Sequence, residues 1–347
     1  MAKMKAAFFD GKNAMDIAEV ERPQPTPGDV VIRVHATGIC GSDLLMNVDK
    51  TEPDAIPFGH EVSGEIVEVG AGVDRSLVGQ RVAVETIGQG LACSKCWYCR
   101  QGQFRQCRNK AKDEGGGFAE YMKRRAIGCY QLPDGLSWEE GAFVEPMAVS
   151  VHSVRRGQMQ GGETVVVLGS GSIGLTAIIA ARALGAGRIF ATARHEQQAE
   201  MARRLGADSV LSPEGDALKA AVEAATDGRG ADMTIETVGG HTGATLEQAI
   251  AVTRMQGRIV ILGGFRRPIT TDWMAPLLKE QSILFSSCYS VLNGQHDYEL
   301  ALDLLASGKA PLTPLVTHTF PLENVDEGFR TAYEKSTTGS IKVQIVQ

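Results

Sequence analysis

Short apolar runs alternate with helical patterns between about residue 162 and residue 290. The segments Glu196–Leu205 and Thr242–Arg254 show the helical pattern most clearly. Strands that alternate with helices predict an α/β fold, a doubly wound parallel sheet with right-handed crossovers. The six expected strands are Thr164–Leu168, Arg188–Thr192, Ser209–Leu211, Asp232–Glu236, Arg258–Leu262 and Ser282–Phe285.

The first 150 residues have a different pattern, rich in Gly, Pro and short β-branched runs. Runs such as Val30–Val34, Glu65–Val69 and Arg81–Val84 predict a β-rich domain of short strands joined by turns. After residue 290 the pattern predicts one helix, Tyr298–Ser307, and an alternating final strand, SIKVQIV. We expect that strand to return to the first domain. The predicted domains are residues 1–153 with 291–347, and residues 154–290.

Composition and charge are those of a globular enzyme. The 347 residues are 43% hydrophobic and 22% charged, with a net charge of −6. This balance argues against a nucleic-acid partner, which requires a concentrated basic face. The amino terminus lacks the apolar core of a signal peptide, and the most apolar helix, near Leu175–Leu184, is short and contains Arg182. We therefore expect a cytoplasmic protein with no membrane partner.

A glycine fingerprint follows the first strand of the predicted parallel sheet. VVVLGSGSIG places Gly169, Gly171 and Gly174 between a strand and a helix, with Ser172 and Ile173 among them. The first glycine permits a tight turn, the second lets backbone N–H groups approach a pyrophosphate, and the third allows close helix packing. Because strand, glycines, helix and next strand occur in order, the pattern predicts a dinucleotide site.

The end of the second predicted strand lacks the acidic residue that usually binds the ribose of NAD. Ala193 stands there, 19 residues after Gly174, and Arg194 follows it. Ala193 neither accepts a ribose hydroxyl nor repels a 2′-phosphate, and Arg194 is suited to bind that phosphate. We therefore predict a preference for NADP. The alternative is that Arg194 and His195 are a solvated loop edge and that NAD is accepted without the acid.

Four of the seven cysteines are spaced C-x2-C-x2-C-x7-C. Cys93, Cys96, Cys99 and Cys107 suit a closed tetrahedral zinc site with a structural role. An iron–sulfur cluster and a disulfide are the alternatives. The long last spacing and Arg108 argue against the ferredoxin run, in which the fourth cysteine follows three residues later and precedes proline.

A second group of potential ligands is dispersed along the chain. It comprises Cys40 in GICGSD, His60 and Glu61 in FGHE, and Glu145 in FVEP. This N/O/S set suits a catalytic zinc that keeps a position for water or substrate. Spacing alone favours the simpler interpretation of a buried thiol, a core histidine and surface acids.

Seven sequence motifs decide between these interpretations. They are, in order, GICGSD, GHEVSGEIVEVG, GQRVAVE, the four-cysteine lobe, GGFAEY, FVEPMAVSVH and VVVLGSGSIG. Their order closely resembles the zinc-dependent alcohol and polyol dehydrogenases of the medium-chain family, over essentially the whole chain. The resemblance implies a GroES-like catalytic domain interrupted by a Rossmann domain.

The resemblance also assigns roles to individual residues. It makes Cys40 and His60 zinc ligands, and Glu61 the third ligand of members similar to sorbitol and threonine dehydrogenases. Glu145 matches a carboxylate of the same polyol branch that binds the metal directly or through its water. Asp43 fits an acceptor for the His60 ring N–H, and Ser42 matches the hydroxyl that passes on the substrate's proton.

The chain departs from its relatives at two places that bear on the substrate. Leu44, Leu45 and Met46 stand where many relatives carry an outer proton-relay histidine. Cys288 precedes Tyr289 where sorbitol dehydrogenases pair an arginine with a tyrosine. With Leu45 and Met46 expected in the substrate pocket beside Cys288 and Tyr289, a long polyol becomes less favourable.

The sequence therefore predicts a dehydrogenase with two zinc ions per chain that transfers a hydride between a secondary alcohol, or a small hydroxylated substrate, and NADP. The alternatives are an NAD-dependent enzyme similar to threonine 3-dehydrogenase or sorbitol dehydrogenase, and a cofactor-binding protein without catalysis. Relatives form dimers and tetramers, so we expect a homo-oligomer.

Overall fold

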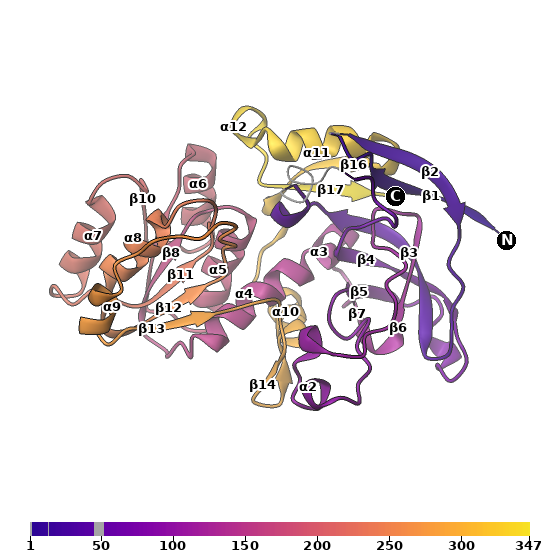
Figure 1. The fold of residues 1–347 in the computed structure, drawn as a ribbon, viewed down its shortest axis with the longest axis horizontal. Coiled ribbons are helices and arrows are strands. Elements are labelled where there is room, and N and C mark those ends of the chain that lie inside the picture. Colours follow the sequence, from indigo (N-terminus) through magenta and orange to yellow (C-terminus); the bar gives the residue numbers. More distant parts are fainter. Residues whose placement is uncertain (1, 13, 45–51) are drawn as a thin grey trace. The chain divides into compact units, whose positions relative to one another are not determined.

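The computed structural model describes residues 2–12, 14–44 and 52–347. The chain divides into two units, drawn in Figure 1. The first comprises Met1–Glu145, Tyr289–Ala306 and Leu312–Gln347, and the second comprises Pro146–Cys288 and Ser307–Pro311. The second unit is therefore inserted in the first.

The second unit contains a parallel sheet of six strands in the order β10-β9-β8-β11-β12-β13. Its first strand in sequence, β8, lies in the middle, and the chain winds outward first to one side and then to the other. This order is that of dinucleotide-binding folds, and it confirms the predicted doubly wound sheet. The strands are β8 (Thr164–Leu168), β9 (Arg188–Thr192), β10 (Ser209–Leu211), β11 (Ala231–Glu236), β12 (Thr253–Ile261) and β13 (Ser282–Phe285).

Helices connect these strands, and the helix predicted over Thr242–Arg254 is shorter at both ends, because it begins at Ala244. The helix expected to reach Arg254 ends at Val252, because the chain turns there into β12, whose Thr253 pairs with Ala231. Val166, Leu246 and Ile259 are among the buried side chains of the core between sheet and helices. The helices are α4 (Val144–Arg156), α5 (Ser172–Ala183), α6 (Glu196–Arg204), α7 (Ala217–Ala225), α8 (Ala244–Val252) and α9 (Met274–Leu278).

The first unit is built on a sheet in the order β16-β17-β3-β4-β5-β7, with β6 also pairing with β3. The final strand β17 runs antiparallel to β3, with Gln344 opposite Gly38, which confirms that the end of the chain returns to the first domain. The strands are β3 (Asp29–Gly38), β4 (Glu61–Val69), β5 (Arg81–Glu85), β6 (Tyr121–Arg125), β7 (Cys129–Gln131), β16 (Val316–Pro321) and β17 (Lys342–Val346).

Short elements complete the first unit. They include a hairpin of β1 (Lys3–Phe9) and β2 (Met15–Glu21), and α10 (Asp297–Ala306), where the sequence predicted a helix one residue later. Along the described part of the chain, no helix has the length and apolar character needed to cross a membrane. The remaining elements are α2 (Trp97–Arg100), α3 (Trp138–Ala142), α11 (Val325–Tyr333), α12 (Lys335–Thr338), β14 (Val291–Leu292), β15 (Gln295–His296) and five 3₁₀ turns, Arg75–Leu77, Phe104–Gln106, Ala126–Gly128, Thr313–Leu315 and Leu322–Asn324.

Candidate functional site

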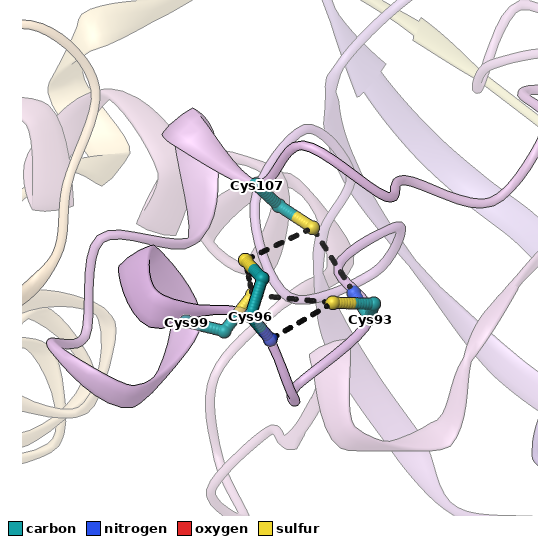
Figure 2. Close-up of side chains that lie close together, drawn as sticks. All are labelled: Cys93, Cys96, Cys99 and Cys107. Atoms are coloured by element: carbon teal, nitrogen blue, oxygen red, sulfur yellow. Dashed lines mark hydrogen bonds between the residues drawn. The ribbon is translucent and has the colours of Figure 1, made fainter.

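The four cysteines of the lobe point their sulfur atoms toward one another (Figure 2). Their Sγ atoms all lie within 4.8 Å, with Cys96 3.5 Å from Cys99 and 3.9 Å from Cys107. Four sulfurs bound tetrahedrally at about 2.3 Å from zinc are about 3.8 Å apart, so the group fits that ion. All seven cysteines are free thiols, which removes the disulfide alternative.

Backbone N–H groups also donate hydrogen bonds to these sulfurs, which favours the thiolate form that a cation binds. The N–H groups of Lys95 and Cys96 donate to the Cys93 sulfur at 3.4 and 3.3 Å. Backbone hydrogen bonds from Cys99 and Arg108 lower the pKa of Cys96 to about 6. Backbone hydrogen bonds lower the pKa of Cys93 too, whereas burial raises that of Cys99 to about 12. Because thiolates are the form that binds metal, the backbone contacts favour metal binding at Cys93 and Cys96.

A second group of ligand atoms forms where β3 ends and β4 begins. The Cys40 sulfur, a His60 ring nitrogen and a Glu61 carboxylate oxygen lie within 4.8 Å of one another. Pairing of Gly38 with Glu61 places the end of β3 beside the start of β4, which brings together residues 20 positions apart. One sulfur, one nitrogen and one oxygen form a donor set that fits a zinc ion with an open position.

The other predicted residues of this site surround that trio. Asp43 accepts a hydrogen bond from the Cys40 N–H at 2.9 Å, and its other oxygen lies 3.5 Å from Nδ1 of His60. Glu145, buried in the first turn of α4, is not within the trio. Ser42 is exposed and Leu44 is half-buried. Leu45 and Met46 lie outside the described residues.

Lys342 is a residue of this site that the sequence did not reveal. Its Nζ lies 2.7 Å from Oε1 and 2.5 Å from Oε2 of Glu61, and it donates to the Ile39 carbonyl at 3.0 Å. Lys342 and Glu61 are 2% and 1% exposed, so this is a fully buried ion pair. A Cβ at Gly38 would lie 2.0 Å from Oε2 of Glu61, and the glycine therefore leaves room for the carboxylate.

Glu85 is a second residue that the sequence did not single out. It is fully buried, and it accepts a hydrogen bond from the Gln89 N–H at 2.7 Å. Its Oε2 lies 3.1 Å from the Tyr130 hydroxyl and 3.3 Å from Nε2 of His296. The Tyr298 N–H donates to Nδ1 of His296, which assigns the ring proton to Nε2 and directs it toward Glu85.

The pKa values of the acids around the trio are raised. Burial raises the pKa of Asp43. It also raises the pKa of Glu145 to about 7 and the pKa of Glu85 to about 8. Burial by itself would lower the pKa of His60, but the charges of Asp43, Cys40 and Glu145 outweigh it and raise that pKa well above its usual value. The raised pKa of His60 reports nearby negative charge that also favours a cation, whereas burial of Glu85 and Glu145 favours their neutral forms.

The glycine fingerprint adopts the expected conformation in the second unit. Gly169 has a φ of 92°, which a side chain would strain, and Gly171 is the N-cap of α5. A Cβ at Gly174 would lie 2.0 Å from the Gly169 carbonyl oxygen, whereas one at Gly171 would meet open space. The open space leaves a phosphate free to approach the start of α5, where Ser172 and Ile173 lie.

Two side chains fix this loop beside the end of β9. The Gly169 N–H donates to Oγ1 of Thr192 at 2.9 Å, and the Ser170 hydroxyl donates to the Thr192 carbonyl at 2.9 Å. Ala193, whose N–H donates to Leu211, and the exposed Arg194 follow directly. The structure thus brings the glycine loop next to the two residues that the sequence connected with the cofactor's ribose. Ser170 and Thr192 were not predicted.

Cys288 and Tyr289 lie at the junction of the two units. Cys288 ends the second unit with a φ of 59°. Tyr289 begins the return to the first unit and is 2% exposed, with its ring 5.1 Å from that of Tyr298. Tyr289 therefore packs on the same aromatic residues that surround Glu85.

Comparisons with known proteins agree with these features. Residues 26–134 match the alcohol dehydrogenase GroES-like domain, and residues 172–307 match the zinc-binding dehydrogenase model. The sorbitol dehydrogenase of Bacillus subtilis is 33% identical, over 95% of this chain and 94% of its own length. This chain belongs to the zinc-dependent medium-chain alcohol and polyol dehydrogenases. It is an oxidoreductase that acts on alcohol groups.

Other members of the family show how far its substrates and cofactors vary. L-Idonate 5-dehydrogenase of Vitis vinifera is 33% identical, over 94% of this chain and 91% of its own. Among solved structures, a zinc-binding dehydrogenase of Sinorhizobium meliloti bound to NADP has a TM-score of 0.85 and 27% identity, with both chains fully covered. An alcohol dehydrogenase of Escherichia coli in complex with NADH has a TM-score of 0.87 and 27% identity, also with both chains fully covered.

Proposed function

We propose that Cys40, His60 and Glu61 hold the catalytic zinc of this dehydrogenase, that Glu145 contacts the metal or its water, and that the four-cysteine lobe holds a second, structural zinc. The observation that carries the proposal is the convergence of three different ligand atoms within 4.8 Å at the adjoining ends of β3 and β4. The raised pKa of His60 supports it, because the negative charges that favour a proton there also favour a metal ion.

The other residues of the site have separate roles in orienting the ligands and transferring the proton. When bound, zinc would supply a Lewis acid that lowers the pKa of an alcohol, and the nicotinamide would supply the hydride acceptor. Asp43, whose Oδ1 lies 3.5 Å from Nδ1 of His60, is placed to orient that ring, and Lys342 holds the Glu61 carboxylate. Ser42 accepts the proton that the alcohol releases and passes it to water, since Leu44 occupies the first position after the CGSD motif.

Removal of one ligand tests the catalytic site. We expect Cys40→Ser and His60→Ala to lose nearly all kcat/KM and to retain one zinc per chain instead of two by elemental analysis. Cys129→Ser removes a thiol outside both groups and is the matched control. Full activity in either ligand variant contradicts the proposal.

For the cofactor we infer a preference for NADP. The support is an exposed Arg194 beside Ala193, at the strand end where an acid would select NAD. We expect kcat/KM to be higher with NADP than with NAD, and Arg194→Ala to reduce that ratio about tenfold or more. Arg203→Ala, an exposed arginine of α6, is the control. A kcat/KM with NAD equal to or above that with NADP contradicts the inference.

The substrate we propose is a secondary alcohol or a small hydroxylated compound. Cys288 replaces the arginine that holds polyol hydroxyls in sorbitol dehydrogenases, which removes a donor of several hydrogen bonds. Ranking secondary alcohols, diols, sugar alcohols and β-hydroxy acids by kcat/KM tests this. A long sugar alcohol at the top of the ranking would contradict it.

We also propose that the protein is a homo-oligomer that associates through β13 and α9. β13 is an edge strand of the parallel sheet, and it contains no proline, lysine or bulge that would block pairing with another strand. Leu278 and Phe285 are 74% and 72% exposed, and Trp273, Met274 and Leu277 are also exposed. A second copy related by a two-fold axis offers the same apolar strand edge in return.

A further inference from the structure

The end of β11 lies beside the end of β8, at the edge of the parallel sheet that carries the glycine fingerprint. Glu236 pairs in register with Leu168, which directly precedes the fingerprint, and Thr237 donates its N–H and its hydroxyl to the Leu168 carbonyl at 3.1 and 2.7 Å. From β8 the chain winds outward through β9 on one side and through β11 on the other. A dinucleotide binds where the strand order reverses in this way, with one half on each side. Because Arg194 follows β9, we expect the nicotinamide half at the end of β11.

Glu236 fixes the turn that follows β11. Its side chain is 0% exposed, and its Oε1 accepts the N–H groups of Val238 and Gly239 at 2.9 and 2.8 Å. Gly239 has a φ of 60°, a conformation that favours glycine. One carboxylate oxygen therefore holds two consecutive peptide groups of the turn.

The same carboxylate lies against the loop that follows β12. A Cβ at Gly263 would lie 2.4 Å from Oε2 of Glu236 and 2.2 Å from the Gly239 nitrogen, so the glycine leaves room for both. The Gly240 N–H donates to the Gly264 carbonyl at 2.9 Å and joins the two loops. A Cβ at Gly240 or at Gly264 would meet open space. The joined loops therefore present backbone that a ligand can approach closely.

The stability of the fold does not by itself account for Glu236. Its Oε2 is buried, and no donor among the described residues reaches it. Buried polar atoms are nearly always hydrogen-bonded, and an unsatisfied one is unfavourable for folding. An apolar side chain would remove that unfavourable contribution but would leave the Val238 and Gly239 N–H groups without their acceptor. Glu236 therefore suits the shape of the turn better than it suits the stability of the sheet.

We propose that Glu236 is a positioning residue, which shapes the turn of residues 237–240 for the nicotinamide half of the cofactor. It acts through the reach of its Oε1 and not through charge, because both of its hydrogen bonds require only an acceptor oxygen at the end of a side chain of this length. The inference rests on the proposed binding of a nicotinamide cofactor and does not depend on the metal ligands.

Two kinds of ligand separate the halves of the cofactor site. NADPH and NADH have both halves, whereas ADP, with or without a 2′-phosphate, lacks the nicotinamide half. Glu236→Asp keeps the carboxylate but shortens its reach. We expect it to raise the Kd of the dinucleotide that the wild type prefers by about tenfold or more, and to leave the Kd of the matching form of ADP unchanged. Titration calorimetry of the zinc-loaded protein measures both Kd values.

Two further variants distinguish positioning from a general effect. Glu236→Gln keeps the length and an acceptor oxygen without the charge, and we expect its ratio of the two Kd values to equal that of the wild type. Glu163→Asp makes the same shortening just before β8, at the opposite edge of the sheet, where Glu163 accepts the Gln160 N–H and pairs with Arg258. This matched control should lower the stability without changing the ratio.

Three results overturn the inference. The first is a ratio in Glu236→Asp equal to that of the wild type. The second is an equal change in Glu236→Gln and Glu236→Asp, because charge would then be the cause. If Glu236→Asp does not fold, Gly263→Ala decides, since its Cβ would press on Glu236 and Gly239. An unchanged ratio in Gly263→Ala is the third result.

The proposed function has a separate readout, which is oxidation of an alcohol by the wild-type enzyme. If the ratio changes as expected but no alcohol is oxidised, the proposed function fails and the inference stands. If alcohols are oxidised and the ratio does not change, the inference fails and the proposed function stands.

Discussion

At the scale of single residues, Lys342 should stabilise the zinc-free protein, because it is the ion-pair partner of the buried Glu61 carboxylate. Lys342→Met leaves Glu61 without its ammonium partner in a region where both are at most 2% exposed. Loss of one partner of a buried ion pair costs about 3–5 kcal/mol, so we expect a loss of that order in the free energy of unfolding of the zinc-free protein.

The zinc-loaded Lys342→Met protein should lose less stability, because the ion also neutralises Glu61. Urea unfolding with and without zinc measures both values. Lys5→Met breaks an exposed ion pair with Glu323 and should change little in either form. An equal loss with and without zinc would show that Lys342 does not act through Glu61.

Glu85 should make stability depend on pH. Its folded pKa, about 8, is raised above its usual value, so the unfolded chain releases this proton at lower pH than the folded protein. Stability from this group is therefore complete at pH values below the usual pKa of glutamate and is lost as pH rises toward 8. The loss is at most about 1.4 kcal/mol for each pH unit in that range.

Glu85→Gln lacks the titrating proton and should gain stability relative to the wild type as pH rises from 6 to 8. Above about pH 8 the difference should become constant. Urea unfolding of both zinc-loaded proteins at several pH values measures it. A difference that does not vary with pH would mean that Glu85 titrates normally.

At the scale of elements, the four-cysteine lobe should depend on its metal. Phe104, in the lobe, stacks on His296 at a ring distance of 5.8 Å, and Gly102 accepts a hydrogen bond from Val291. We expect Cys107→Ser to remove one zinc per chain and lower the Tm, because metal-binding energy is folding energy in such lobes. Its kcat should fall less than that of Cys40→Ser. A variant that retains two zinc ions would contradict the structural assignment of the lobe.

Strand β17 shows what the sequence could and could not reveal. The alternating SIKVQIV predicted a strand with one polar face, and the strand forms. Both faces of the strand are covered, however, because Lys342 and Gln344 are 2% and 0% exposed on one face and Val343 and Ile345 are 1% and 0% exposed on the other. A period of two reports which residues share a face and does not report whether a second layer covers that face.

The same distinction applies to the rest of the site. The lobe cysteines were predicted from their spacing. Cys40 and His60 were predicted from the resemblance of their motifs to the family, because spacing alone favoured a buried thiol and a core histidine. Glu85 resembles any acid at the end of a strand, and only the register of β4 with β5 places it beside Glu61. Long-range pairing of this kind depends on the assembled sheet and is not encoded in local spacing.

At the scale of the whole molecule, the exposed edge of β13 predicts how copies associate. Phe285→Asp or Leu278→Asp places a charge on an apolar surface that would be buried between two copies, where an unpaired charge is very unfavourable. We expect either variant to sediment as a monomer at concentrations at which the wild-type chain is a dimer or larger. Val78→Asp adds the same charge at another exposed apolar residue, in the first unit, and should not change the assembly.

The activity of such a monomer would show whether association matters for the chemistry. The three proposed zinc ligands and the acids around them all belong to the first unit, and β13 belongs to the second. A monomer should therefore retain two zinc ions per chain. If both Phe285→Asp and Leu278→Asp sediment like the wild-type oligomer, the copies associate through a different surface. In that case the edge of β13 is not paired with another copy.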